Sequence, residues 1–283
     1  MSPTALALVL LAALLHAGWN ALTKRAKDPL VFLWSSMGVA AAGLTPIAAV
    51  LWAREGFPAQ GRAYAAGSVA VHAIYFVALA TSYRHADFSI VYPVARGLGV
   101  ALTPLLALAL FAEWISALGA TGIALVVVGI GLSAGRAPAD GAPRSARGVV
   151  WAVATGVCIG VYSILDSAGA RRVHPAVYLC TLTVGAVVLC APLVLRRRAA
   201  LLAEWRQNWR TILLASTMNL SGYVLVLFAY RLSKTGYVVA CRELSIAIAP
   251  LLGRVVLGET RTASRALGTA VIVGGVVCVA LAR

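Results

Sequence analysis

The sequence predicts an all-α polytopic membrane protein, with ten transmembrane helices arranged as two inverted five-helix repeats. Its composition and an internal repeat support this prediction. Of the 283 residues, 61% are hydrophobic and 12% are charged, whereas soluble domains average about 25% charged residues. A soluble core could not bury so much apolar surface, so we expect the chain to lie in a lipid bilayer.

Ten apolar stretches approach or exceed the roughly 20 residues that cross a hydrocarbon layer of about 30 Å. Because a spanning segment must satisfy its own backbone polar groups, these stretches are predicted to be helices. The first has no basic region before it, so it is expected to remain as a helix and not to be cleaved as a signal peptide. The predicted spans are residues 4–22, 30–52, 63–83, 88–111, 116–134, 148–170, 175–195, 211–230, 235–257 and 263–281.

A constant offset of 146 residues aligns much of the first half of the chain with the second. The polar Pro/Gly-rich stretch GRAPADGAPRSAR, residues 135–147, separates residues 1–134 from residues 148–283 and is predicted to be a linker. Each half then holds five spans, and an odd number makes the second half enter from the opposite side of the membrane. The aligned pairs include Pro29 with Pro175, Pro46 with Pro192, Arg96 with Arg242, Pro104 with Pro250, and Glu113 with Glu259.

Arg96 and Arg242 lie inside the fourth and ninth predicted spans. A charge at a helix centre costs roughly 2.5–3.5 kcal/mol, so intramembrane arginines usually face a protein interior or watery cavity and mark a substrate path. The other 22 of the 24 Lys and Arg residues lie in loops or at span ends, where they meet lipid headgroups. The net charge of +15 therefore does not indicate a nucleic-acid partner.

Polar residues on several other spans are expected to face the same interior as the arginines. His16, Trp19 and Asn20 are spaced i, i+3, i+4 and share one helix side, and the 146-residue offset carries His16 and Asn20 onto Tyr162 and Asp166. We predict a polar substrate cavity walled by both halves. Spans five and ten are expected outside it, against lipid or a second subunit of a homodimer. The remaining predicted substrate-binding residues are His72, Tyr75, Tyr92, Asn219, Tyr223 and Glu243.

Each of these residues also has a structural alternative. A single His, Asn or Tyr in a membrane helix is more often an interhelical hydrogen-bond partner, worth roughly 0.6 kcal/mol on average. The arginines could form buried ion pairs, Arg96 with Glu243 or Arg242 with Asp166. The five cysteines show no metal-ligand spacing, so we predict no metal or other cofactor.

Two segments resemble the EamA-type domain of the drug/metabolite transporter superfamily: YPVARGLGVALTPLLALALFAEWISALGATGIALVVVGI in the first half and CRELSIAIAPLLGRVVLGETRTASRALGTAVIVGGV in the second. HAGWN, residues 16–20, resembles the polar-aromatic first helix of that family. The resemblance implies alternating access about a midplane site, with spans five and ten as a peripheral pair. It leaves the substrate open, because the family moves amino acids, sugars, phosphorylated metabolites, amines and drugs.

We therefore expect a secondary transporter, acting as an exporter of a small anionic or zwitterionic metabolite. A drug or amine efflux carrier, a lipid-handling protein and a channel remain alternatives. No HExxH, GxSxG or P-loop motif is present in the sequence, so we expect neither an enzyme nor an ATP-driven pump. A coupling proton on His16, His72, Asp166 or Glu243, or a counter-substrate, is a further expected partner.

The expected location is a bacterial inner membrane, and two arguments disagree on orientation there. If the termini were cytoplasmic, most Lys and Arg residues would lie on the other side, so the positive-inside rule favours termini outside. The family resemblance favours termini in the cytoplasm.

Overall fold

The computed structural model describes residues 1–23, 26–86, 88–133, 146–248 and 263–282 and contains no strand in those ranges. Seven of the described helices, α1 to α4 and α6 to α8, are long and apolar enough to cross a membrane, and α5 and α11 are shorter apolar helices. The helices are α1 (Pro3–Thr23), α2 (Pro29–Glu55), α3 (Ala59–His85), α4 (Phe88–Phe111), α5 (Ala117–Ser133), α6 (Ala146–Ala170), α7 (Pro175–Leu195), α8 (Arg198–Leu232), α9 (Thr235–Arg242) and α11 (Ala263–Leu281).

Local signals set several of the helix starts. The Asp28 carboxylate accepts hydrogen bonds from the backbone N–H groups of Leu30 and Val31, at 3.1 and 3.2 Å, and Pro29 occupies the first helical position of α2. This N-cap satisfies two donors that have no partner within the helix. His174 and Pro175 begin α7 in the same way, with the His174 ring accepting from Ala176 N.

Helix α8 is longer than the predicted span of residues 211–230, because it begins at Arg198. The added turns are rich in arginine, so the search for apolar stretches did not include them. A helix end that lies outside the bilayer can be polar. The backbone is non-helical at Asn208, whose amide donates to the Glu204 carboxylate at 2.6 Å.

Helix α9 ends at Arg242, whereas the sequence predicted one continuous helix over residues 235–257. Glu243 forms a turn, and residues 244–248 are helical again. The break has no glycine or proline at its centre, so the sequence pattern did not indicate it. Residues 249–257 of that span, Pro250, Glu259 and most of the predicted linker lie outside the described residues.

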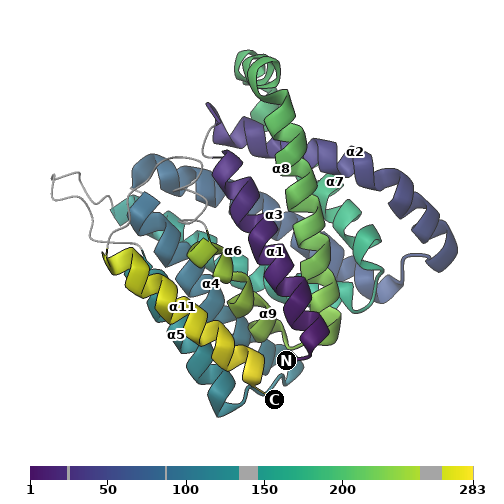
Figure 1. Cartoon of the computed structure of the whole chain (residues 1–283). Coiled ribbons are helices and arrows are strands. Elements are labelled where there is room, and N and C mark those ends of the chain that lie inside the picture. The colour runs from purple at the N-terminus through teal and green to yellow at the C-terminus, as the bar shows by residue number, and fades with distance from the viewer. Residues whose placement is uncertain (24–25, 87, 134–145, 249–262, 283) are drawn as a thin grey trace.

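The two predicted peripheral helices, α5 and α11, pack along each other, at one side of the molecule in Figure 1. Glycines line their contact, and a Cβ atom at Gly122 would lie only 2.6 Å from the Gly275 carbonyl oxygen. Elsewhere in the fold, α1 packs against α8 and α3 against α6. The two chain ends are adjacent (Figure 1), and the Met1 amino group donates to the Ala282 carbonyl at 2.6 Å.

Candidate intramembrane charge site

Arg96 of α4 and Glu243, directly after α9, form a buried ion pair between the two halves of the chain. Arg96 Nε donates to Glu243 Oε2 at 2.9 Å, and Nη2 donates to Oε1 at 2.7 Å. The side chains are 8% and 1% exposed. Two parallel bonds of this kind are the strongest geometry available to an arginine and a carboxylate. Of the two ion pairs that the sequence left open, Arg96 with Glu243 is therefore present.

Arg242 of α9 lies beside this pair and has no comparable partner. The residue is 3% exposed, yet within the described residues its Nε and Nη2 atoms make no hydrogen bond. Its guanidinium interacts electrostatically with the phenols of Tyr162 and Tyr230 and with the Glu243 carboxylate. The alternative pair of Arg242 with Asp166 is not formed, because no carboxylate in the described part of the chain lies within 4.0 Å of Arg242.

The position of Arg242 follows from the break in α9. As the last residue of that helix, it meets the negative end of the helix dipole, which favours a cation. The following turn at Glu243 sends its carboxylate towards Arg96, so Glu243 is held by the other arginine. Broken helices near the midplane are a recurring way to build solute sites in transporters.

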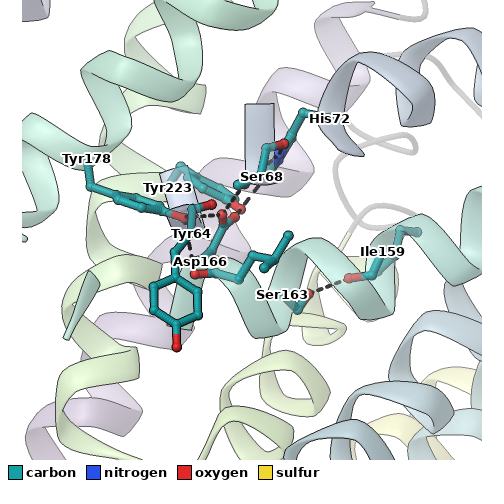
Figure 2. A network of polar contacts seen from close by, with 9 residues as sticks. Tyr64, Ser68, His72, Ile159, Ser163, Asp166, Tyr178 and Tyr223 are labelled. Carbon is teal, nitrogen blue, oxygen red and sulfur yellow. Dashed lines mark hydrogen bonds and ion pairs between the residues drawn. The ribbon is translucent and has the colours of Figure 1, made fainter. Parts of the chain in front are cut away.

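Asp166 of α6 forms the centre of a second polar cluster (Figure 2). It is completely buried. Ser68 of α3 and Tyr223 of α8 donate to its carboxylate, and the Tyr178 hydroxyl of α7 lies 3.2 Å from Oδ1. The Nε2 atom of His72 lies 3.9 Å from Oδ2. Three helices, α3, α7 and α8, thus bring hydroxyl or imidazole groups to one carboxylate.

Aromatic rings connect this cluster with the Arg242 environment. The His72 ring stacks on Tyr162 at a centroid distance of 4.3 Å, and Tyr75 meets the edge of Tyr162 at 5.7 Å. Tyr162 in turn interacts with the Arg242 guanidinium. Tyr223, a hydrogen-bond partner of Asp166, does so as well. Arg242 and Asp166 are therefore not paired, but share the same phenol neighbours.

The predicted residues of the first span meet the Arg96 side of the site. His16 Nε2 lies 3.5 Å from Arg96 Nη2, and Trp19 packs against the His16 ring with centroids 5.0 Å apart. Asn20 donates to the His16 carbonyl at 2.7 Å, within its own helix. Tyr92 interacts electrostatically with Arg96, and Asn219 is half-buried on α8.

Comparison with known proteins supplies the family. Residues 146–281 match the model of the EamA-like transporter family, and residues 32–126 match the model of the Small Multidrug Resistance protein. Both models belong to the drug/metabolite transporter superfamily. This chain is a member of that superfamily. It is therefore a multi-pass integral membrane transporter.

A solved crystal structure of a protein has the same fold as this transporter. It aligns over 99% of this chain and 98% of its own, with a TM-score of 0.74 at 19% sequence identity. Among curated proteins, none matches the chain.

Further polar contacts join the two halves of the transporter near its surfaces. Glu113, which follows α4, binds Arg171 at 2.7 Å and accepts a hydrogen bond of 2.7 Å from the backbone of Thr235, the first residue of α9. Glu113 thus caps a helix of the other half. On the opposite side, Asp28 binds Arg197 at 2.9 Å.

Ser68 lies outside the set of predicted substrate-binding residues, and so does Tyr178. Tyr178 lies in the seventh predicted span, whose other residues are mostly aliphatic, and its partner in the first half under the 146-residue offset is Phe32. The available signal was the Tyr178 hydroxyl itself, because the corresponding Phe32 in the first half has none. The burial of Tyr178 is complete, because it packs against Gly169, where a Cβ would lie 2.1 Å from its ring.

Proposed function

We propose that this transporter moves a small anionic or zwitterionic metabolite across a bacterial inner membrane by alternating access. The observation that carries the proposal is the buried Arg242 guanidinium, whose Nε and Nη2 atoms have no hydrogen-bond partner among the described residues. Leaving buried donors unpaired costs about 1–3 kcal/mol, and more for charged groups. A bound anion would supply the missing acceptors.

The Arg96–Glu243 pair indicates how that anion would bind. Arg96 holds Glu243 with its Nε and Nη2 atoms, and these are the two atoms that Arg242 leaves free. Arg96 and Arg242 are also equivalent under the 146-residue offset. A substrate carboxylate or phosphate would therefore occupy at Arg242 the place that Glu243 occupies at Arg96.

The buried acids argue against an organic cation as the substrate. Glu243 is fully engaged by Arg96, and Asp166 is surrounded by hydroxyl groups. Neither carboxylate is free to bind an amine or a lipophilic cation. An unpartnered arginine would also repel such a substrate, which adds a second penalty.

The helix packing supports alternating access between two inverted halves. Under the 146-residue offset, the pairing of α1 with α8 becomes the pairing of α6 with α3, and the pairing of α2 with α8 becomes that of α7 with α3. An arrangement whose contacts interchange in this way is expected of inverted repeats. In such a transporter, rocking of one half against the other would open Arg242 to each side in turn.

Counterflow in proteoliposomes tests the proposal with a panel of labelled probes: L-glutamate, L-serine, glycerol 3-phosphate and tetraphenylphosphonium. We expect saturable exchange of at least one anionic or zwitterionic probe by the wild type. Arg242→Ala should abolish it, and Arg242→Lys should leave weakened exchange, because lysine keeps the charge but loses the planar pair of donors.

Arg210→Ala is the matched control, because Arg210 is an exposed arginine on the polar end of α8. It should exchange the same probe at the wild-type rate, with equal membrane expression of all variants. Normal exchange by Arg242→Ala would overturn the assignment of Arg242. Exchange of tetraphenylphosphonium alone would overturn the anionic substrate class.

A further inference from the structure

The Asp166 cluster contains an imidazole whose hydrogen-bond geometry fixes the position of its proton. Ser68 has one hydroxyl hydrogen and donates it to Asp166, so its oxygen is an acceptor towards His72. His72 Nδ1 lies 3.1 Å from that oxygen and 2.9 Å from the Ser68 carbonyl. A carbonyl only accepts, so Nδ1 carries the hydrogen of the neutral ring.

This tautomer leaves the lone pair of the neutral ring on His72 Nε2, close to a carboxylate. Nε2 lies 3.9 Å from Asp166 Oδ2, and in the described part of the chain His72 is the one basic side chain within 4.0 Å of Asp166. With the ring neutral, a lone pair faces an anionic oxygen. With a proton on Nε2, the same geometry becomes an ion pair.

The carboxylate itself is well supplied with donors. Ser68 and Tyr223 each donate their hydroxyl hydrogen to it, and the Tyr178 hydroxyl lies 3.2 Å from Oδ1 and 3.1 Å from the Leu165 carbonyl. His72 Nε2 lies 3.9 Å from Oδ2, so a proton on Nε2 would have Asp166 as its counter-ion.

We propose that His72 and Asp166 form a proton-binding site of this transporter, and that this proton moves together with the anion held by Arg242. The coupling of the proton to the anion rests on the proposed function, whereas the proton-binding site does not. The proton is taken up at His72 Nε2 from the side to which the site is open, and is released unchanged on the other side. No covalent bond other than N–H is made or broken.

The surroundings of the pair favour joint binding of proton and anion. The cations of α4 and α9 are Arg96, which Glu243 neutralises, and Arg242, which is free for the substrate. Tyr162 stacks on His72 and also lies within electrostatic range of Arg242. The phenols that face the pair from α6, α7 and α8 are Tyr162, Tyr178, Tyr223 and Tyr230.

A protonated His72 raises the positive charge that an anion at Arg242 meets, and by linkage a bound anion strengthens proton binding equally. Co-transport with protons uses an inward proton gradient for uptake. This direction differs from the export expected from the family resemblance.

The proton site is tested first without any substrate, on the full chain in lipid nanodiscs with ¹⁵N-labelled histidine. The chain has only four histidines. The imidazole signal that His72→Gln removes should show the Nδ1–H tautomer near pH 8 and become imidazolium on acidification towards about pH 5. Asp166→Asn should remove this protonation. A neutral or Nε2–H ring throughout, or an identical titration in a folded Asp166→Asn variant, would overturn the site.

The coupling is tested in proteoliposomes that contain a pH-sensitive dye, with L-glutamate and L-serine as probes. Neither probe changes its charge appreciably between about pH 5 and pH 8. In vesicles loaded without probe, wild-type protein should acidify the lumen as the probe enters by net uptake. Its half-saturating probe concentration should fall about 5- to 150-fold from pH 8 to pH 5, the range typical of coupled sites. His72→Gln should move no protons and should keep its pH 8 affinity at pH 5.

His85→Gln is the matched control for His72→Gln. His85 lies on the same helix and binds the carbonyl four residues earlier at 2.9 Å, as His72 does, so His85→Gln should retain proton movement. Net probe uptake without proton movement, or net uptake driven by sodium, would overturn the coupling and leave the proposed function standing. If neither probe exchanges, the proposed function fails for them, and the histidine titration still decides the proton site.

Discussion

Glu243→Gln is expected to destabilise this transporter strongly, because it removes the one carboxylate bound to a buried arginine. The Arg96 side chain is only 8% exposed, and that of Glu243 1%. Removing one partner of a buried pair typically costs about 3–5 kcal/mol, since the other charge stays buried and unpaired. Among the described residues, the Nε and Nη2 atoms of Arg242 make no hydrogen bond either, so the variant would hold two buried arginines that lack a bound carboxylate there.

Arg96→Gln should destabilise less than Glu243→Gln. The released Glu243 already interacts with Arg242, whose Nε and Nη2 atoms are free to bind it. That alternative pairing would restore part of the lost energy. It would also occupy the proposed anion site, so Arg96→Gln should inhibit probe exchange more than its loss of stability explains.

The double variant Arg96→Gln/Glu243→Gln separates the pair from its surroundings. Two amides leave no unpaired charge at these positions, so the double variant should be more stable than the sum of the single effects by at least about 3 kcal/mol. Unfolding in mixed detergent micelles, followed by tryptophan fluorescence, measures all three variants. Additive single effects would refute the assignment of Arg96 and Glu243 as an energetically coupled pair.

A surface pair provides the control for this double-mutant cycle. Asp28 and Arg197 lie 2.9 Å apart, but their side chains are 21% and 34% exposed, so their coupling should be at most about 1 kcal/mol. Asp28→Asn is suitable for the cycle because asparagine can still cap α2.

Three further outcomes are expected. Gly122→Ala should lower the unfolding midpoint, because its Cβ would lie 2.6 Å from the Gly275 carbonyl. Gly131→Ala should leave the midpoint unchanged, because no atom lies within 4 Å of the added Cβ. Equal midpoints of the two variants would contradict the close α5–α11 contact. Val127→Ser, on α5, should leave the half-saturating probe concentration unchanged, and a large shift would extend the site to this helix. Glu113→Gln should impair probe exchange less than Glu243→Gln does at matched expression, and equal small effects would argue against a role for Glu243 at the site.

Much of the fold could be predicted from the sequence, because lipid imposes long apolar helices. The ends of the α4 and α7 spans agree with the structure to the residue, since Pro175 and the polar turns mark them. The polar start of α8 could not be found in this way, because hydropathy marks only the residues inside the bilayer and not the part of the helix that continues beyond it. The break at Glu243 also escaped prediction, since a tertiary ion pair holds it.

The site was predictable as a set of residues but not as a network. The cost of buried charge identified Arg96 and Arg242 from the sequence. Which acid pairs with which arginine could be decided only from the structure. The partners of Asp166 come from α3, α7 and α8, and spacing along one helix carries no information about which helices meet. Tyr178 was missed for this reason.

The two buried acids of the site, Asp166 and Glu243, both belong to the second half of the chain, and this makes the two halves electrically unequal. Under the 146-residue offset, Glu243 corresponds to Gly97 and Asp166 to Asn20, whereas the two arginines correspond to each other. A carrier whose halves were true copies would have equal energies when open to either side. Under the proposed alternating access, the inward- and outward-open forms of this chain would differ in their charge contacts. One of the two forms should then be more populated in the absence of substrate.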